Sequence, residues 1–397
     1  MSRAPLDGIV VIDLTQIFNG PYATFMMAAA GAEVIKIEPP GGEHLRNRTV
    51  NPTSRLPYAM LNSGKKSLRL DLKQSAGREV LLRLVERADV LIENFAAGVM
   101  DRLGLGRDVL LARNPRLVCA SSTGYGSVGP YRDYPAMDVT VQAMAGFIDS
   151  TGFPDGPPVK AGPAACDFLS GVHLYGAVVT ALLSRERSGQ AHAVEVTMLE
   201  AAYFALSSGL GMVQANGPGA IGRTGNSHGA LIVCPYNVYP TCDGYLSVCV
   251  NHDAHWRSLM AAIDRPELGT DPRYATNAQR VAHMAEVDAL LAEWTSTRAR
   301  DAVFDALVSR KIPCAPVRRM DEVLADPHLH ERGSLREIDH PEYGRLTVAA
   351  SPLRFDGEAS LPERPSVPLG TDGRAVLRER LGLDDAELDA LERDRII

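Results

Sequence analysis

Asp167 is the carboxylate whose position in this sequence most invites a chemical interpretation. It lies in the segment CDFLSGVH, at the start of a long stretch rich in Leu, Val and Ala. A positioned carboxylate can act as a nucleophile toward an activated acyl group. Aspartate is also among the residues preferred as the cap of a helix. The residues of this segment, taken alone, favour the helix cap.

A second group of chemically suggestive residues is basic. Lys and Arg are dense between Arg46 and Lys73, although the whole chain has a formal net charge of -7. Such a group can bind an anion. It can equally be a solvated face of loops and strand ends. On charge density alone we favour the solvated face.

Several familiar signatures of cofactor chemistry are missing. The first predicted strand is followed by DLTQIFNGPYAT, which holds one Gly where dinucleotide-binding folds need a GxGxxG run to approach a pyrophosphate. There is no GxxxxGK[ST] loop for a nucleoside triphosphate. The Cys and His residues form no CxxC pair, no HExxH and no spacing typical of zinc ligands. We therefore expect no nicotinamide, flavin or metal, and cysteines that are reduced.

The elements that would position these residues alternate between strands and helices. Residues 9–14 are apolar except for Asp13, 22–30 are helix-forming and 34–37 are apolar except for Lys36, which predicts a βαβ unit. The pattern then repeats, with strands at 67–72, 90–93, 117–121 and 193–196 and helices at 76–87 and 167–185. Such alternation predicts a parallel sheet covered by helices.

The pattern changes after a helix that begins near Met198. A Gly-rich stretch from Gly209 to Gly225 is a candidate linker. Beyond it we predict a smaller α+β domain. Its predicted elements are strands at 236–239 and 245–250 and helical stretches at 255–263 and 281–307. The tail after Asp326 adds a strand at 345–350 and a helical end from Arg374.

Length and composition set broader limits. The chain has 397 residues, of which 45% are hydrophobic and 22% charged, as in an ordinary globular protein with one large or two medium domains. The acidic total argues against a general nucleic-acid binder. No uninterrupted apolar run approaches the ~20 residues of a membrane span, and MSRAPLDG lacks the apolar core of a signal peptide. We expect a cytoplasmic enzyme with neither a nucleic-acid nor a membrane partner.

Motifs in the same order along nearly the whole chain resemble the family III CoA-transferases, the carnitine and bile-acid CoA-transferase family. They include PLDGIVVIDLTQIFNGPYAT, GAEVIKIEPPGG, NSGKKSLRLDLK, DVLIENFAAGVMDRLGL, SSTGYGSVGPY, MDVTVQAMAG, CDFLSGVH and RTGNSHG. The resemblance implies an α/β fold: a large Rossmann-type domain with a parallel sheet, an inserted small α+β domain, and an interlocked homodimer. We place the first part of the large domain at residues 1–224, the small domain at 225–326 and the return to the large domain at 327–397.

The resemblance also implies catalytic roles. The family's nucleophile matches Asp167, which would carry CoA as an aspartyl thioester between an acyl-CoA donor and a small carboxylic acid acceptor. Succinyl-CoA is a common donor in relatives. Asp138 in MDVTVQAMAG matches a position that often bears a carboxylate, and we expect it to orient groups around Asp167. No cofactor beyond coenzyme A, which is a substrate, is implied.

The expected contacts with CoA come from three parts of the sequence. The N-terminal turn should line the CoA and acyl site, and basic side chains further on suit the phosphates. The residues that the resemblance implies as contacts in this binding site are Gln16, Ile17, Phe18, Asn19, Arg46, Leu70, Lys73, Asn94, Phe95 and Arg102. One position where the family leads us to expect a basic residue is Pro39 here, and we expect Arg46 or Lys65 to replace it. His228 in RTGNSHG is a candidate contact for the acceptor acid, with a structural histidine as the alternative.

Two alternative functions remain open. The racemase branch of the same fold uses a histidine just before the position of Asp138 as a base on an α-methylacyl-CoA. Here that residue is Met137, which cannot accept a proton, so we favour the transferase. A CoA-binding protein without turnover is the other alternative. Relatives that use oxalate carry a Gly-rich loop in the small domain, and no such run lies between Gly225 and Asp326, which disfavours oxalate.

Overall fold

The computed structural model describes residues 4–48, 55–360, 362 and 364–397. The chain divides into two compact units. Unit 1 consists of Met1–Met144, Gly162–Phe204 and Leu324–Ile397, and unit 2 consists of Ala145–Ala161 and Ala205–Val323. The domain boundaries after residues 224 and 326 remain a prediction. We describe each unit by itself.

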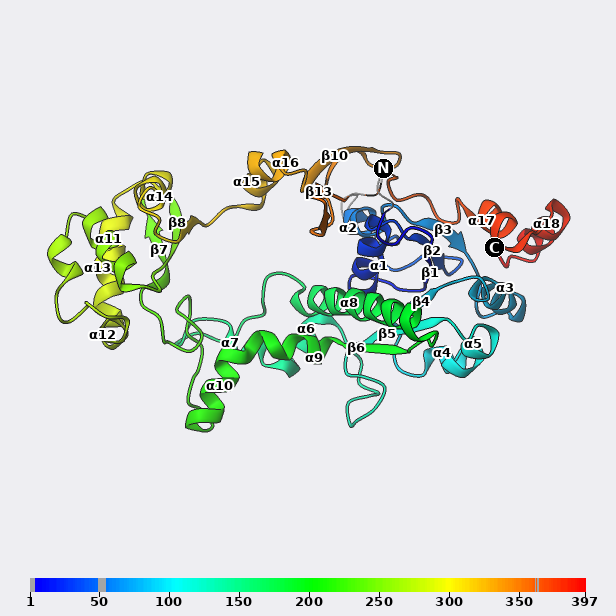
Figure 1. Cartoon of the computed structure of the whole chain (residues 1–397), viewed down its shortest axis with the longest axis horizontal. Helices are drawn as coiled ribbons and strands as arrows, with labels where there is room; N and C mark the ends of the chain where they lie inside the picture. Colours follow the sequence, from blue (N-terminus) through cyan, green and yellow to red (C-terminus); the bar gives the residue numbers. More distant parts are fainter. Residues whose placement is uncertain (1–3, 49–54, 361, 363) are drawn as a thin grey trace. The chain divides into compact units, whose positions relative to one another are not determined.

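Unit 1 is built on a six-stranded parallel sheet with the strand order β3-β2-β1-β4-β5-β6 (Figure 1). Doubly wound nucleotide-binding folds have this order, in which the direction of winding reverses between the first and fourth strands. The strands are β1 (Val10–Asp13), β2 (Glu33–Glu38), β3 (Lys66–Arg69), β4 (Val90–Glu93), β5 (Val118–Thr123) and β6 (Val194–Thr197). The parallel sheet expected from the sequence is therefore confirmed.

The sheet separates two apolar cores because successive residues of a strand point to opposite faces. Val11 and Val90 belong to the core beneath α1 (Asn19–Ala29) and α8 (Ala165–Ser188). Ile12 belongs to the opposite core. The helices that supply this second core are α3 (Ser75–Val85), α5 (Arg107–Arg113), α17 (Gly373–Leu381) and α18 (Asp385–Arg393). The end of the chain thus returns to unit 1.

Helix α8 runs along the sheet beside α1 (Figure 1). Its 24 residues are long and apolar enough to span a membrane, but one such helix is weak evidence. The fully buried Leu174 and Val178 pack against strand residues, as in the core helix of a globular protein. Gly171 permits the close approach to α1, because a Cβ there would lie 2.6 Å from the carbonyl oxygen of Asn19. At the far end, the largely buried Arg185 pairs with Asp89 at 2.9 Å.

Unit 2 contains a three-stranded antiparallel sheet, β7-β8-β9. The strands are β7 (Tyr236–Thr241), β8 (Gly244–Cys249) and β9 (Cys314–Pro316). Trp256 lies at 0% exposure in the core and donates to the carbonyl oxygen of Leu268 at 3.1 Å. The helices are α7 (Phe147–Ser150), α10 (Ser207–Asn216), α11 (Asp253–Ala262), η3 (Pro266–Gly269), α12 (Asn277–Ala282), α13 (Met284–Ser296) and α14 (Arg300–Val308).

Two predictions for unit 2 were wrong in detail. The helical stretch at 281–307 is divided among the end of α12, α13 and α14. The Gly-rich segment predicted as a linker begins within α10, because single glycines are tolerated in a helix at a modest cost. The small α+β architecture itself is present.

The remaining elements are short. Two antiparallel pairs lie in the returning part of the chain, and several one- or two-turn helices connect the larger elements. They are α2 (Leu56–Leu61), α4 (Val99–Arg102), α6 (Asp138–Ala145), α9 (Met198–Tyr203), η2 (Phe204–Leu206), α15 (Met320–Leu324), α16 (Pro327–Glu331), β10 (Leu335–His340), β11 (Gly344–Ala349), β12 (Arg354–Phe355) and β13 (Glu358–Ala359). Of these, α6 matters most for the site.

Candidate functional site

A cavity of about 460 Å³ lies in unit 1 beyond the carboxyl ends of β1 and β4. Ligands of open parallel sheets bind at this place, where the strand order reverses. Gln16 follows β1, Asn94 follows β4, and Thr123 ends β5, and all three line the cavity. Asp167, from the first turn of α8, lines it as well. The sheet topology therefore gathers residues that lie far apart in sequence.

Asp138 and Asp167 meet at the wall of this cavity. Asp138 is the first residue of α6, and its Oδ1 accepts the backbone N–H groups of Cys166 at 2.9 Å and Asp167 at 3.2 Å. The N-cap residue of α8, Ala164, has no side chain that could accept these bonds. Asp138 therefore caps α8 from another element. Asp167 is the third residue of the helix, so the interpretation of Asp167 as its cap was wrong.

The Asp167 carboxyl is poorly stabilised as an anion. It is 9% exposed, and no residue in the described part of the chain donates a hydrogen bond to it. Burial and the nearby charge of Asp138 raise the pKa of Asp167 to about 7. An acid that titrates near neutrality beside a cavity is typical of functional sites.

The turn after β1 is held by side chains from elsewhere in unit 1. The Asn94 amide pairs with the backbone of Gln16, since its Oδ1 accepts the Gln16 N–H and its Nδ2 donates to the Gln16 carbonyl, both at 2.8 Å. Ile17 has a φ of 67°, which is strained for a β-branched residue. Its N–H donates to Glu43 at 3.1 Å. The N–H groups of Gln16 and Ile17 are therefore occupied.

A buried ion pair supports the same turn. Lys65 Nζ lies 3.1 Å from Asp13 Oδ2, and both side chains are almost fully buried. Burial alone would raise the pKa of Asp13, but the charges of Lys65 and Lys36 and hydrogen bonds from neighbouring threonines lower it to about 2. Burial lowers the pKa of Lys65 to about 8, against the attraction of Asp13. Lys65 donates directly to the Asp13 carboxylate, so the pair is charged at neutral pH.

The ion pairs explain the density of basic residues between Arg46 and Lys73. Arg46 binds the buried Glu38 at 2.8 Å, and Lys66 binds Glu33 at 2.8 Å. Lys65 is occupied by Asp13, so the expectation that it replaces the missing basic group at Pro39 was wrong. Arg46 also has a strong internal partner, and its contact with a phosphate remains a prediction. These three side chains are engaged within the protein, whereas Arg48, Arg69 and Lys73 are exposed, so the predicted solvated face is present in part.

Arg102 differs from these basic residues in its surroundings. It lines the cavity, and in the described part of the chain no residue forms an ion pair with its guanidinium. A Cβ added to Gly98 would lie 3.1 Å from Arg102 Nη1 and 3.8 Å from Arg132 Nη2. Two guanidinium groups from residues that line the cavity thus approach one glycine. Together they form a positively charged region where an anionic group of a ligand can bind.

The other predicted site residues are distributed as follows. Ile17, Asn19 and Phe95 line the cavity. Phe18 stacks on Phe168 of α8, with ring centroids 5.9 Å apart.

Three predicted residues lie elsewhere. Leu70 is buried in the core, and Lys73 is exposed. His228 belongs to unit 2, where its Nδ1 accepts the N–H of Ala230 at 3.1 Å and its ring meets Tyr236 edge-on. The roles assigned to these residues remain predictions.

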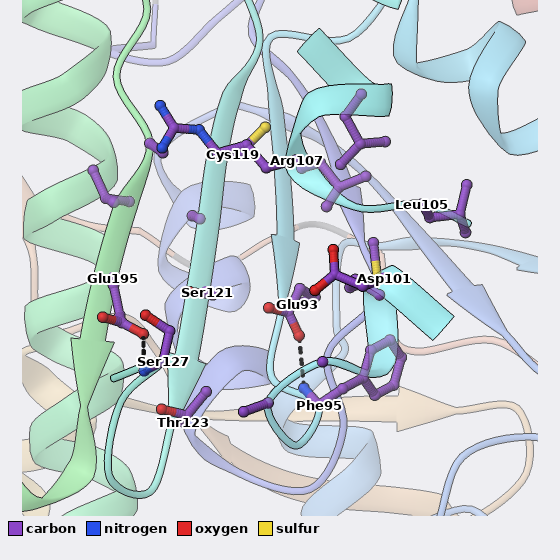
Figure 2. A pocket seen from close by; sticks show the side chains of 18 of the residues that line it. Glu93, Phe95, Asp101, Leu105, Arg107, Cys119, Ser121, Thr123, Ser127 and Glu195 are labelled. Atoms are coloured by element: carbon purple, nitrogen blue, oxygen red, sulfur yellow. Dashed lines mark hydrogen bonds between the residues drawn. The ribbon is translucent and has the colours of Figure 1, made fainter. Parts of the chain in front are cut away.

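A second cavity, of about 400 Å³, adjoins the first and shares Phe95 and Thr123 with it (Figure 2). Glu93 points into it and accepts the N–H of Phe95 at 2.8 Å. Burial raises the pKa of Glu93 to about 7, with smaller effects from Glu195 and Asp101. This hydrogen bond to Glu93 holds the backbone of Phe95, which lines both cavities.

Several residues of the site were missed from the sequence. They are the buried Gln142, which binds Asp138, and the cavity-lining residues His44, Tyr125, Arg132 and Tyr134. The sequence offered one indication of where such residues lie. The segment SSTGYGSVGPY follows a strand of the parallel sheet, at the edge where ligands of such sheets bind. Among the described residues, no group of three or more His, Cys, Asp or Glu side chains is arranged to hold a metal ion.

Comparison with known proteins identifies relatives along the whole chain. The profile of CoA-transferase family III matches residues 6–373. The acetyl-CoA:oxalate CoA-transferase of Acetobacter aceti is 35% identical over 97% of this chain and 98% of its own length. The succinyl-CoA:mesaconate CoA-transferase of Haloarcula hispanica is 34% identical over 95% and 96%. The crystal structure of a CaiB/BaiF family protein from Brucella suis superposes with a TM-score of 0.83 at 33% identity, covering 96% of this chain and 100% of that one.

Proposed function

This chain belongs to CoA-transferase family III, and from that premise we propose that it moves CoA from an acyl-CoA to a small carboxylic acid through a thioester on Asp167. The observation that carries the proposal is the Asp167 carboxyl itself. It lines a cavity, lacks hydrogen-bond donors in the described part of the chain and has a pKa raised to about 7 by burial and by Asp138. An anion so weakly solvated by its surroundings is a better nucleophile than an exposed aspartate.

The first half of the proposed reaction charges the enzyme with CoA. The ionised Asp167 oxygen attacks the carbonyl carbon of the donor thioester, and the carbon–sulfur bond breaks to give a mixed anhydride and the CoA thiolate. The thiolate then attacks the Asp167 carbonyl carbon and displaces the donor carboxylate. Asp167 is left as a CoA thioester.

The second half repeats these steps with the acceptor. The acceptor carboxylate attacks the Asp167 thioester and expels the thiolate, which gives a second mixed anhydride. The thiolate attacks the acceptor's acyl carbon, and Asp167 leaves as a free carboxylate. No proton is consumed overall, so the site needs an ionised aspartate and protection from water rather than a general acid.

The cavity contributes binding as well as chemistry. We propose that Arg102, together with Arg132, receives an anionic group of CoA, because both side chains line the cavity and their guanidinium groups approach the same glycine, Gly98. Met137 lines the same cavity and cannot act as a base, which disfavours the racemase alternative.

The acceptor acid is proposed only as a class. Relatives are named for oxalate or mesaconate at similar sequence identity, so similarity supports a small dicarboxylate but does not choose which one. The lack of a Gly-rich run between Gly225 and Asp326 still disfavours oxalate. A screen of acids by mass spectrometry of the acyl-CoA products identifies the acceptor.

The proposed intermediate is testable by trapping. The enzyme is incubated with acyl-CoA and then with hydroxylamine, which converts an aspartyl thioester to a hydroxamate, and the modified peptide is located by mass spectrometry. We expect the adduct on Asp167, and loss of both adduct and CoA transfer in Asp167→Ala. Asp108→Asn, an exposed carboxylate in the first turn of α5, is the control and should retain both. Full CoA transfer by Asp167→Ala would overturn the mechanism.

We also propose that the chain forms a homodimer. Large apolar side chains such as Phe204 and Met320 are 76% and 83% exposed on the single chain, which supports their burial by another copy. Light scattering after size exclusion should give twice the chain mass of 42.8 kDa. A monomeric mass across working concentrations would contradict this proposal.

A further inference from the structure

Gln142 is a fully buried polar side chain, 0% exposed, to which the proposed reaction assigns no role. It lies on α6, one turn after Asp138. Its Nε2 donates to Asp138 Oδ2 at 2.6 Å and to the carbonyl oxygen of Pro163 at 3.3 Å. Pro163 lies just before α8, so this single amide joins the start of α6 to the segment that enters α8.

The Asp138 carboxylate is held through both of its oxygens. Oδ1 accepts the N–H groups of Cys166 and Asp167, and Oδ2 accepts Gln142. The carboxylate cannot rotate without losing at least one of these bonds. The N-terminus of α8 also favours a negative charge at this place. Gln142 therefore determines where the charge of Asp138 lies.

We infer that Gln142 is a positioning residue for the nucleophile: it orients Asp138, and Asp138 in turn holds the first turn of α8 and places a negative charge beside Asp167. This inference rests on the proposed function of Asp167. Gln142 is enclosed by protein and acts through Asp138, so its effect is on the orientation and ionisation of Asp167 rather than on substrate contact.

Other ionisable groups near Asp167 come from several elements. Those of the cavity wall and adjoining helices are Tyr22, His44, Arg102, Tyr125, Arg132, Asp133, Tyr134 and Cys166. In the described part of the chain, none of their side chains forms a hydrogen bond with the Asp138 carboxylate. When Gln142 is removed, Asp138 Oδ2 loses this hydrogen bond and the carboxylate is free to turn away. This change weakens the negative charge beside Asp167.

The central test replaces Gln142 with a side chain of similar length that cannot donate. In Gln142→Met we expect the acidic limb of the kcat/KM profile to move to lower pH by roughly one unit, because a like charge near the carboxyl has weakened. We expect kcat at high pH to fall roughly tenfold, with KM for the acyl-CoA little changed, because the nucleophile is less well oriented. Gln142→Asn, which keeps the amide but withdraws it by one methylene, should move the limb in the same direction and serves if the Met variant does not fold.

A double-mutant cycle separates action through Asp138 from general packing. Asp138→Asn should itself move the acidic limb to lower pH, and adding Gln142→Met to it should move the limb no further. The matched control is Asn114→Leu, which removes another side-chain amide that bridges two carbonyls, those of Val85 and Ala88 at 2.9 and 2.8 Å. The control should lower the melting temperature and leave the limb in place. A Gln142→Met enzyme that behaves like this control would overturn the inference.

A direct titration of Asp167 distinguishes failure of this inference from failure of the proposed function. The carboxyl carbon is followed by NMR in protein labelled with 13C-aspartate and is assigned by its loss in Asp167→Asn. A lower titration midpoint in Gln142→Met, in an enzyme that forms no aspartyl-CoA, would uphold the positioning of Asp167 and overturn its role as nucleophile. An unchanged midpoint in an enzyme that does form the thioester would overturn the positioning role alone.

Discussion

At the residue scale, the two carboxyl groups of the candidate site differ in how they are solvated by the protein. Asp138 receives hydrogen bonds from two backbone N–H groups and from Gln142, whereas the Asp167 carboxyl receives none from the described residues. When two neighbouring acids have such different environments, one can serve as a fixed charge while the other is the reactive group. The difference comes from contacts rather than from residue type.

The raised pKa of Asp167 predicts an unusual dependence of stability on pH. Because the folded-state pKa of about 7 lies above the ordinary 3.8, the folded protein holds this proton more tightly than the unfolded chain. Its contribution is fully present below about pH 4 and is lost as the pH rises through about 7. Asp167→Asn should therefore be more stable than the native protein at pH 8, by roughly 2–4 kcal/mol, with the difference disappearing toward pH 4. Urea unfolding at both pH values measures this.

The same ionisation should limit activity at low pH. CoA transfer by the native protein should fall as the pH drops below about 7, since the protonated Asp167 is not a nucleophile. Equal stability of the native protein and Asp167→Asn at pH 8 would contradict the raised pKa.

Arg102 supports a prediction about CoA affinity. A charge-assisted hydrogen bond to a phosphate contributes roughly 1.5–3 kcal/mol, so Arg102→Gln should weaken CoA binding about 10- to 100-fold by calorimetry. Arg116→Gln is the control, because Arg116 is exposed and its partner Glu186 is a surface residue. An unchanged dissociation constant for Arg102→Gln would show that its guanidinium does not bind CoA.

At the element scale, the position of the nucleophile depends on how closely α8 approaches α1. A Cβ on Gly171 would lie 2.6 Å from the Asn19 carbonyl oxygen and 3.3 Å from the Tyr22 ring, so one helix must shift to accommodate it. Gly171→Ala should cost roughly 1–3 kcal/mol of stability and lower CoA transfer, because the shift moves Asp167 relative to the turn after β1. Thermal unfolding and kcat measure the two effects.

The same helix provides the control for this substitution. Gly176 has no atom within 4 Å of the position of an added Cβ. Gly176→Ala should raise stability by about 0.5–1 kcal/mol through helix propensity and leave CoA transfer unchanged. If both variants behaved alike, the close contact of Gly171 would not be what positions α8.

The larger elements were predictable from local pattern. The apolar runs of β1, β2 and β4 and the length of α8 carry their own signal, because burial on both faces of a parallel sheet demands continuous apolar strands. Short helices such as α4 and α6 carry little periodicity and were not predicted.

The candidate site was predictable only in part. The resemblance pointed to Asp167 and Asp138, but the contacts that define their environment join distant segments. The bond between Asn94 and Gln16 spans 78 residues, and that between Asp138 and Cys166 spans 28. A single sequence contains no local pattern for such pairs. The internal partner of Lys65 was missed for the same reason, since Asp13 lies 52 residues away.

At the scale of the whole molecule, the stability of unit 1 depends on charged side chains that are buried in its interior. Lys65→Met should leave Asp13 as an unpaired buried carboxylate and cost roughly 3–5 kcal/mol in urea unfolding at neutral pH. The neighbouring Lys66→Met is the control and should cost less than about 1 kcal/mol, because the ion pairs of Lys66 are partly exposed. Adding Asp13→Asn to Lys65→Met should recover part of the loss. An equal cost for the two lysines would contradict a sealed ion pair.

Helix α8 has a consequence for how this protein can be engineered. Its 24 residues extend about 36 Å, with Asp167 in the first turn and the Arg185–Asp89 pair near the other end. Inserting one residue between them would turn one end relative to the other by about 100°, which would carry the Asp167 carboxyl out of the cavity while the sheet stayed intact. Substitutions at exposed positions of α8, such as Gly176, are open to design, but the register of the helix is not, and insertions for labels or tethers belong in the loops of unit 1 instead.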